Sequence, residues 1–364
     1  MIPLLKPSCT QAEIDQVMST LLTGWWGQGP KCEEFERKIA VLHGYKYAVT
    51  VNSATAALHL ALKVLGIGPG DEVIVPALTF ISTALAVSYC SAKPIFADVC
   101  EDTLTIDWGK LPISRNTKAV IAVDYAGYPA GPNRKTLEHV YSEACPMIGA
   151  PIIQDAAHSC GGYMYGASVC FSFHPVKNLA TGDGGCVLTN DEQQYNRMKA
   201  LRWCGINKST FDRVQSKYGW DYNIQEIGYK YHWNDIQAAI GLAQLGRLPE
   251  LLNRRRDIAR MYAINMPHHV TIPMYHEKHM FHLFPIRVDA DKRDKIIDYL
   301  LANGISAGVH YKPLTYYPMY SDQSTPPVTE REWKRLISLP IFYDMTDEQV
   351  EYVCDKVKES VKIC

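Results

Sequence analysis

Two stretches near the middle of the sequence carry residue types that can do amine chemistry. The first, QDAAHSCGG, holds Asp155 just after a short apolar run, and the second, FSFHPVKNLATGDGG, holds Lys177 in a loop between apolar segments. A lysine in such a loop can form a Schiff base with a carbonyl compound. A carboxylate at the end of a strand can pair with a protonated ring nitrogen. Pyridoxal phosphate requires both groups of its protein.

Other residues could hold the phosphate and the ring of that cofactor. Ser53, Ala54 and Thr55 open a predicted helix, where free N–H groups and the helix dipole favour a phosphate. Ser172 stands five residues before Lys177, and its hydroxyl can donate to a phosphate oxygen. Phe80 follows a strand-ending proline and is a candidate to stack on the ring. The sequence therefore predicts a site for pyridoxal 5'-phosphate.

Each of these residues also has a plainer interpretation. A lone lysine is usually on the surface, and Asp155, Ser53 and Thr55 could simply cap helices. Phe80 could belong to the core, and His158 could be a satisfied polar side chain. The set is more informative than its members, because one cofactor needs these residue types in this order.

The elements that would position these residues alternate between strands and helices. Helical patterns cover residues 10–22, 29–44, 53–66 and 79–90, and strand patterns cover 46–52, 71–76, 93–99, 117–127, 150–157, 168–174 and 184–191, the last two as a hairpin. Such alternation with apolar strands predicts an α/β fold with a mainly parallel sheet covered on both faces. Ligands bind at the carboxyl ends of such strands, where the polar clusters fall.

A second, smaller unit is predicted after a long helical pattern over residues 233–266. Pro249 is expected to kink or split this helix, so we place the domain boundary there. This gives a large domain over 1–249 and a small C-terminal α+β domain over 250–364. The small domain is expected to contain strands at 281–289 and 306–311 and helices at 292–304 and 347–361.

Composition narrows the class of protein. The 364 residues have a formal net charge of −1, which gives no sign of a nucleic-acid or membrane surface. The uncharged stretch 73–92 contains Pro76 and reads as a strand, a turn and a helix rather than a membrane span. The 11 cysteines are scattered singly, without metal-ligand spacing, so we expect reduced thiols, no metal and a cytoplasmic location.

Several motifs in register resemble one known family. They are GWWGQGPKCEEFE, NSATAALHLAL, GDEVIVPALTFISTALAV, KPIFADV, QDAAHSCGG, FSFHPVKNLATGDGGCVLTND, NDIQAAIGLAQLGRL and ISLPIF. Nearly end to end, the chain resembles the DegT/DnrJ/EryC1/StrS family of sugar aminotransferases. The resemblance implies the aspartate-aminotransferase-like fold (type I), whose large domain binds pyridoxal phosphate and has a mainly parallel seven-stranded sheet.

The resemblance also implies roles for single residues. Lys177 matches the Schiff-base lysine, and Asp155 matches the partner of the pyridine nitrogen. His158 matches the position beside the ring's phenolic oxygen, and Phe80 matches the stacking aromatic residue. The phosphate-binding positions match Ala54, Thr55 and Ser172. A related branch replaces the lysine by histidine and dehydrates its substrate, so the lysine here favours transamination.

The chain departs from the family pattern in two places. In GYKYHWND, Lys230 and His232 stand where most members have Asn and Arg, and the Asn reaches the phosphate of the partner subunit's cofactor. Lys230 could meet that phosphate as a point charge or could face solvent. Residues 124–127 read DYAG where many members have His-Leu-Tyr-Gly, so substrate contacts there are expected to differ.

The function implied is an aminotransferase that forms a homodimer with shared active sites. Its expected donor is glutamate, and its expected acceptor is a nucleotide-linked keto-6-deoxy sugar, with the 4-keto sugar favoured. Trp25, His310 and Tyr311 are the candidate substrate contacts, although Trp25 could instead belong to packing. Two alternatives stay open: an aminotransferase acting on a cyclitol or another non-nucleotide ketone, and a non-catalytic sensor that binds pyridoxal phosphate.

Overall fold

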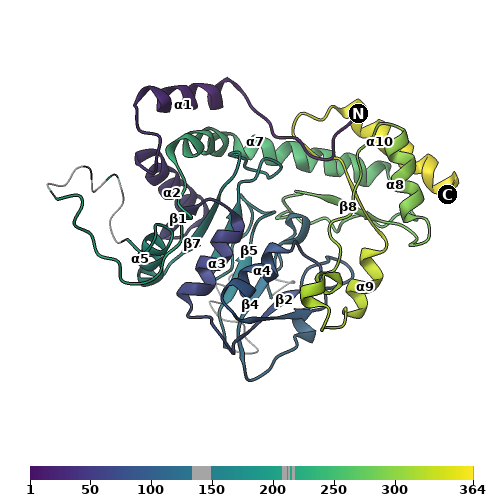
Figure 1. The fold of residues 1–364 in the computed structure, drawn as a ribbon. Helices are drawn as coiled ribbons and strands as arrows, with labels where there is room; N and C mark the ends of the chain where they lie inside the picture. The colour runs from purple at the N-terminus through teal and green to yellow at the C-terminus, as the bar shows by residue number, and fades with distance from the viewer. Residues whose placement is uncertain (133–148, 207–210, 212–213, 215–217, 364) are drawn as a thin grey trace.

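A computed structural model describes residues 1–132, 149–206, 211, 214 and 218–363 (Figure 1). The chain begins with α1 (Gln11–Leu22) and α2 (Pro30–His43). Thr10 caps α1: its hydroxyl accepts from the Ala12 N–H at 3.3 Å, and its own N–H donates to Glu13 at 2.8 Å. This reciprocal pair satisfies donors that the first helical turn leaves free.

The predicted α/β sheet is confirmed. Seven strands follow the order β1-β7-β6-β5-β4-β2-β3, with β1 (Tyr47–Val51), β2 (Glu72–Pro76), β3 (Lys93–Ala97), β4 (Thr117–Val123), β5 (Ile152–Asp155), β6 (Ser168–Ser172) and β7 (Gly185–Thr189). Neighbours from β6 to β3 are parallel, and β7 runs antiparallel to both β1 and β6. The predicted hairpin is therefore β6 and β7. The carboxyl ends of β4, β5 and β6 lie together at one edge.

Helices cover both faces of this sheet. On one face, α3 (Ala54–Val64), α4 (Ser82–Tyr89) and α5 (Glu192–Leu201) pack on a core that includes Val73, Ile121 and Ile153. On the other face, α2 and α7 (Asp235–Asn265) bury an aromatic cluster that includes Phe35, Phe173 and Trp233. Short 3-10 turns complete the loops at Trp108–Lys110, Tyr125–Gly127, Leu314–Tyr316 and Pro318–Tyr320.

The long helix α7 does not split at Pro249. It runs from Asp235 to Asn265 as one element and passes from α1 and α2 at one end to α10 at the other (Figure 1). A proline inside a helix costs about 3 kcal/mol. Leu248, Leu252 and Ile258 on the same helix are buried, and burial of each such side chain contributes about 1.5–3 kcal/mol. Packing on both sides of Pro249 therefore outweighs the lost hydrogen bond.

The C-terminal part contains a two-stranded antiparallel sheet of β8 (Phe284–Arg287) and β9 (Leu336–Leu339). Its helices are α8 (Arg293–Ala302), α9 (Pro327–Trp333) and α10 (Asp347–Ile363). The strand predicted at 306–311 is wrong: only Gly308 forms an isolated bridge, to Ser338. Beyond that bridge the chain leaves the sheet to make side-chain contacts at the site described below.

Among the described residues, no helix combines the length and the hydropathy needed to cross a bilayer. None of the cysteines in these residues forms a disulfide bond.

Candidate active site

Asp155 ends β5 and is buried at the edge where parallel strands terminate. The Thr83 hydroxyl donates to Oδ2 at 2.9 Å, and the Ala157 N–H donates to Oδ1 at 3.2 Å. Burial raises the pKa of Asp155, while these two donors and the charge of Lys177 lower it. The carboxylate is therefore held in place and faces an opposite charge.

Lys177 lies in the loop between β6 and β7, with its backbone N–H bonded to the His174 carbonyl at 2.9 Å. Burial lowers the pKa of its amine to about 8, against an opposing effect of the charge on Asp155. The structure thus brings the two residues predicted for amine chemistry into electrostatic contact. An amine with this pKa is neutral in about half of the molecules at pH 8 and about a tenth at pH 7, and the neutral form can act as a nucleophile or base.

His158, predicted to lie beside the cofactor ring, is fixed by contacts at both nitrogens. The Ala126 N–H donates to Nδ1 at 3.2 Å, and Nε2 lies 3.2 Å from the Tyr311 hydroxyl. Burial lowers the pKa of His158 well below its usual value, so the ring is neutral. Because Nδ1 accepts, Nε2 carries the proton and donates to Tyr311.

His310 and Tyr311, the predicted substrate contacts, do lie near this group. Nδ1 of His310 is 2.9 Å from the Ser338 hydroxyl, and its carbonyl accepts from the Tyr125 hydroxyl. Burial and the charge of Lys177 lower the pKa of His310 to about 4. Phe80 lies at the rim: its ring is 54% exposed and its centroid is 5.7 Å from that of Tyr311. A ring so exposed has a face free for stacking.

The predicted phosphate-binding residues converge at the start of α3. Ser53 is the N-cap and accepts from the Ala56 N–H at 3.1 Å, which leaves Ala54 and Thr55 in the first turn. The Thr55 hydroxyl donates to Ser82 at 2.7 Å. The N–H groups of a first helical turn have no partner within the helix and favour an anion.

Gly185 explains how Ser172 reaches the same place. Ser172 pairs with Gly185 across the β6–β7 ladder. A Cβ on Gly185 would lie only 2.5 Å from the Ser53 carbonyl carbon and 2.8 Å from the Ala54 nitrogen. The close approach of β7 to the start of α3 therefore requires glycine, and Ser172 is the ladder neighbour of that glycine.

Lys230 and Trp25 lie on a different part of the surface. The Lys230 backbone carbonyl accepts from the Asn52 side chain at 3.3 Å, close to the start of α3. Its exposed side chain lies over the Trp203 ring, with Nζ 3.4 Å from the centroid. Trp25 and Trp203 line one hollow of about 320 Å³ together with Trp26 and His232. Within one chain these residues are not in contact with Lys177.

The DYAG turn is a structural junction rather than a contact surface. Asp124 is buried and accepts from the Gln154 amide at 2.7 Å, the Ser159 hydroxyl at 2.5 Å, the Tyr165 hydroxyl at 2.9 Å and the Ala130 N–H at 2.9 Å. Burial raises its pKa to about 6. The carboxylate thus ties β4 to the loop that carries His158.

Two side chains of the site were not predicted from the sequence. Thr83 follows Thr79 by one helical turn, and that spacing is the only sequence signal that could have indicated it. His282 lies with Nε2 3.5 Å from Lys177 Nζ, and a lone histidine inside the apolar run MFHLFPI was the available signal.

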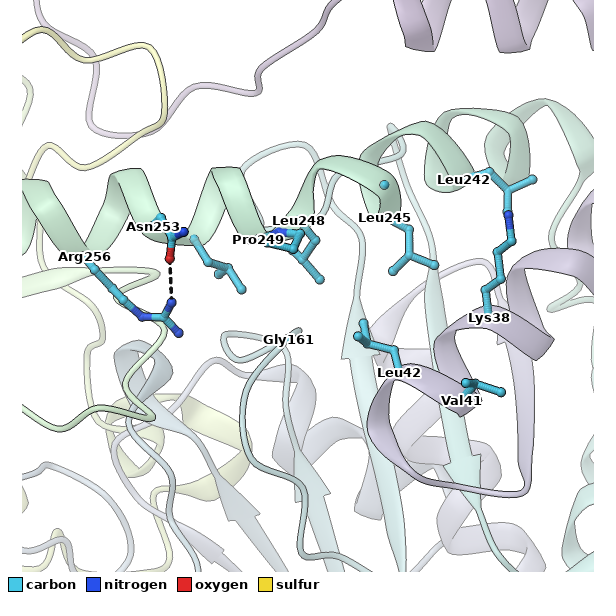
Figure 2. Close-up of a pocket in the computed structure, with 12 residues that line it drawn as sticks. Lys38, Val41, Leu42, Gly161, Leu242, Leu245, Leu248, Pro249, Asn253 and Arg256 are labelled. Carbon is cyan, nitrogen blue, oxygen red and sulfur yellow. Dashed lines mark hydrogen bonds between the residues drawn. The ribbon is translucent and has the colours of Figure 1, made fainter.

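A prominent hollow elsewhere does not have this chemistry. About 520 Å³ lies between α2, α7 and Gly161 (Figure 2). Figure 2 shows leucine side chains of α7 facing Val41 and Leu42 of α2. Its two cations are engaged, Lys38 by Glu34 at 2.7 Å and Arg256 by Asn253 at 3.0 Å. No buried pair of acid and amine lines it.

The residues around Lys177 therefore fit pyridoxal phosphate. A buried amine, a buried carboxylate within reach of its charge, a helix start for the phosphate and an exposed aromatic face come together from separate parts of the chain. These are the groups that this cofactor requires.

Comparison with known proteins gives concordant matches. Residues 7–358 match the DegT/DnrJ/EryC1/StrS aminotransferase family. The chain is 37% identical to the spore coat polysaccharide biosynthesis protein SpsC of Bacillus subtilis (strain 168), over 99% of this chain and 97% of that protein.

Solved structures agree with these sequence matches. A protein of Streptococcus pneumoniae, provisionally assigned as a sugar aminotransferase and solved in its PMP-form, superposes with a TM-score of 0.89 at 30% identity over 100% of both chains. PseC of Helicobacter pylori, an aminotransferase involved in the biosynthesis of pseudoaminic acid, gives a TM-score of 0.89 at 27% identity, again over 100% of both chains.

Proposed function

The chain belongs to the DegT/DnrJ/EryC1/StrS aminotransferase family, and from that membership we propose that it moves an amino group from glutamate to a nucleotide-linked 4-keto-6-deoxy sugar. One observation carries the proposal: the buried amine of Lys177 and the buried carboxylate of Asp155 act on each other's charge in one site. Burial of two charged groups costs several kcal/mol, which their mutual attraction offsets only with good geometry, so a buried pair with perturbed pKa values is a candidate for function.

Pyridoxal phosphate, when bound, supplies an aldehyde that joins to amines and a ring that takes up electrons. In this chain Asp155 would hold the ring nitrogen and Lys177 would make the covalent attachment. His158 would lie beside the phenolic oxygen, and Phe80 would cover one face of the ring. The phosphate would be held by Ala54, Thr55 and Ser172.

Lys177 is also the group that would move the proton. When glutamate has displaced it, its amine is free and, with a pKa of about 8, partly neutral at neutral pH. Nζ then takes the proton from the α-carbon of the donor: the C–H bond breaks, an N–H bond forms, and the electron pair stays with the carbon. Nζ would then give that proton to the carbon of the cofactor's former aldehyde rather than back to the donor carbon, so one residue would act as base and then as acid.

The sugar substrate is proposed from relatives and from side chains near Lys177. SpsC is described by its role in polysaccharide biosynthesis, and PseC by its role in making pseudoaminic acid. His310 and Tyr311 come from the C-terminal part of the chain: the Tyr311 hydroxyl lies 3.2 Å from Nε2 of His158, and the charge of Lys177 acts on His310. We propose that they contact the sugar and that Trp25 contacts the nucleotide end.

We further propose that the working unit is a cytoplasmic homodimer with shared active sites. Support comes from Lys230, whose backbone carbonyl accepts from Asn52 just before α3, while its exposed side chain lies over the Trp203 ring. A second chain placed against this surface could receive that ammonium at its phosphate.

The test uses the purified protein with the cofactor added. We expect it to absorb visible light, to lose that absorption when given glutamate, and to recover it when given a nucleotide-linked 4-keto-6-deoxy sugar. The product is read as a mass shift of the sugar in a panel that includes 3-keto sugars and cyclitol ketones. Lys177→Ala is expected to lower transfer by at least about 10³-fold, whereas the exposed Lys118→Ala leaves it unchanged.

Three outcomes would contradict the proposal. Absorption that persists with glutamate and every other amino donor would indicate a non-catalytic sensor. If the visible absorption recovers only with a cyclitol ketone, the acceptor is that ketone and not a nucleotide-linked sugar. Turnover in Lys177→Ala close to that of the unmodified protein would remove Lys177 from the chemistry.

A further inference from the structure

His282 is a buried titratable group beside Lys177 that the proposed chemistry does not yet use. It is 1% exposed, and its Nε2 is 3.5 Å from Lys177 Nζ, at the outer limit of a hydrogen bond. Its backbone is fixed on both sides: the N–H donates to the Ala126 carbonyl at 2.9 Å, and the carbonyl accepts from Arg255 at 3.3 Å. These contacts hold the main chain of His282 beside Lys177, and burial of the ring limits the rotamers open to its side chain.

The other nitrogen of this ring has no partner among the described residues. Nδ1 of His282 is buried and makes no hydrogen bond to them, and the neighbouring His158 ring packs against it at a tilt of 39°, with centroids 4.4 Å apart. Burial lowers the pKa of His282 well below its usual value, so the ring is neutral. A neutral imidazole has one N–H and one lone pair. Among the described residues, Lys177 is the polar group within hydrogen-bond distance of Nε2 of His282. Nε2 can bond to it in either tautomer, as an acceptor when the proton is on Nδ1 and as a donor when Nε2 carries it.

That freedom suits a partner whose own proton state changes. When Lys177 is an ammonium, Nε2 can accept from it; when Lys177 is an amine, Nε2 can accept one of its two N–H groups or donate to its lone pair. Holding a free lysine side chain in one rotamer costs about 2 kcal/mol of conformational entropy. Proton transfer depends on fixing such a group within about 3–3.5 Å of the reacting atom.

We propose that His282 is a positioning residue: its Nε2 holds the freed amine of Lys177 in the orientation from which Nζ exchanges a proton with the substrate carbon. The inference rests on the proposed function and adds a residue to it. The other charged or titratable groups that act on this pair are Asp155, Arg255, His158 and His310. Of these, only Asp155 carries an opposite charge to Lys177, and it is held by Thr83 and Ala157.

The first test measures the glutamate half-reaction in single turnovers, as loss of visible absorption, with glutamate carrying hydrogen or deuterium at the α-carbon. His282→Phe is expected to slow this step by about 10- to 100-fold and to increase the isotope effect, because proton transfer becomes limiting. His282→Gln, whose amide can reach the same place, should stay within about fivefold of the unmodified protein.

His279→Phe is the matched control. His279 lies three residues away, is also 1% exposed, and its Nδ1 accepts from the Phe281 N–H at 3.0 Å rather than facing Lys177. The isotope effect of this variant should not change. The proposal is overturned if His282→Phe keeps both rate and isotope effect, or if both phenylalanine variants slow equally with an unchanged isotope effect. If His282→Phe does not fold, the comparison of His282→Gln with the shorter His282→Asn gives the same decision.

A second test uses protein from which the cofactor has been removed and does not depend on any substrate. Competitive acylation followed by mass spectrometry gives the pKa of Lys177 from the pH dependence of its labelling. Because Nε2 can accept from the ammonium, His282→Phe should lower that pKa by about one pH unit, and His279→Phe should not change it. An unchanged value overturns the proposal. If the unmodified protein reacts with no amino donor, the proposed function fails and the positioning role fails with it, whereas this second test still decides whether Nε2 of His282 accepts from the Lys177 ammonium.

Discussion

At the scale of single residues, burial opposes the charges that the site needs. Burial lowers the pKa of Lys177 to about 8 and raises that of Asp155, so each group is driven towards its neutral form. The negative charge of Asp155 raises the pKa of Lys177, and the positive charge of Lys177 lowers the pKa of Asp155, so each charge opposes the effect of burial. The hydrogen bond from the Thr83 hydroxyl also lowers the pKa of Asp155. The site therefore contains an amine that can lose its proton near neutral pH and a carboxyl group whose charged form a cationic ligand would stabilise.

This balance has a consequence for stability. The folded pKa of Lys177 lies below its usual value of 10.5, so the folded state binds the proton less tightly than the unfolded state does. The cost is fully present below pH 8 and disappears as the pH rises to about 10.5. Lys177→Met should therefore raise the free energy of unfolding by about 2 kcal/mol at pH 7.

The measurement is urea unfolding of cofactor-free protein at several pH values. The gain from Lys177→Met should shrink steadily between pH 8 and pH 10.5. A gain that stays constant over this range would mean that the charge of Lys177 is not what burial penalises. Lys118→Met, on the surface, should show no pH-dependent gain.

Thr83 offers a graded test of Asp155. Thr83→Val removes the donor to Oδ2, which should raise the pKa of Asp155 further and slow the glutamate half-reaction by about tenfold. Asp155→Asn should slow it by about 10²-fold or more, because the ring nitrogen loses its anionic partner. Rapid-mixing absorption measures both, and Thr83→Ser should restore the rate. An Asp155→Asn variant with an unchanged half-reaction would make Asp155 a structural residue.

At the scale of elements, α7 connects the sheet to the C-terminal part of the chain. One end packs on α1 and α2, and the other packs on α10. Arg255, in its second half, donates to the His282 and Ile341 carbonyls and so links the helix to the segment beside Lys177. A break at Pro249 would separate these contacts, and packing keeps the helix whole.

Pro249→Ala tests what that proline costs. The residue is exposed, so its removal leaves no internal cavity, and alanine restores a backbone donor inside α7. Alanine regains the helical hydrogen bond that proline cannot make, which stabilises the folded state. It also gives the unfolded chain more conformational entropy, which stabilises the unfolded state. We expect the free energy of unfolding to rise by about 1 kcal/mol on balance. Gly246→Ala calibrates the result, because its Cβ would meet open space and should also add about 1 kcal/mol. Loss of stability in Pro249→Ala alone would show that the proline ring contributes packing.

At the scale of the whole molecule, the site is assembled from both parts of the chain. Asp155 comes from the end of β5 and Lys177 from the β6–β7 loop, while His282, His310 and Tyr311 come from the C-terminal part. Small-molecule sites commonly lie between such parts. Another surface, around Lys230, carries several exposed apolar side chains, Tyr218, Trp220, Tyr222, Ile224 and Ile227, which is typical of a surface that another chain covers.

Subunit mixing tests the proposed dimer with shared sites. Lys177→Ala removes the amine of its own site, and Lys230→Ala is expected to weaken phosphate binding in the partner's site by about tenfold at limiting cofactor. In a mixed dimer, one site has its own Lys177 and receives Lys230 from the other chain. Mixing the two variants should therefore recover up to about a quarter of the activity, given random exchange of subunits. Mixtures no more active than the sum of the variants, or full activity in a dilute monomer, would contradict the shared site.

The sequence alone predicted the layers of the fold and the central pair of the site. Apolar periods of 2 and 3.6 residues are local signals, so strands, helices and the β6–β7 hairpin followed from them. Lys177 and Asp155 could be selected because one cofactor needs both residue types, and the family motifs placed Ser172 and Phe80 beside them.

The tertiary structure decided what depends on neighbours far apart in the chain. Local rules predicted a break in the helix at Pro249, but burial along α7 keeps the helix continuous. The same rules predicted a strand over residues 306–311, but His310 contacts Ser338 and Tyr311 contacts His158 instead. The place of His282 beside Lys177, 105 residues earlier, could not be read from any local pattern. Desolvation acts through three-dimensional surroundings, so only the folded chain sets the pKa of Lys177 and the pairing on which its chemistry depends.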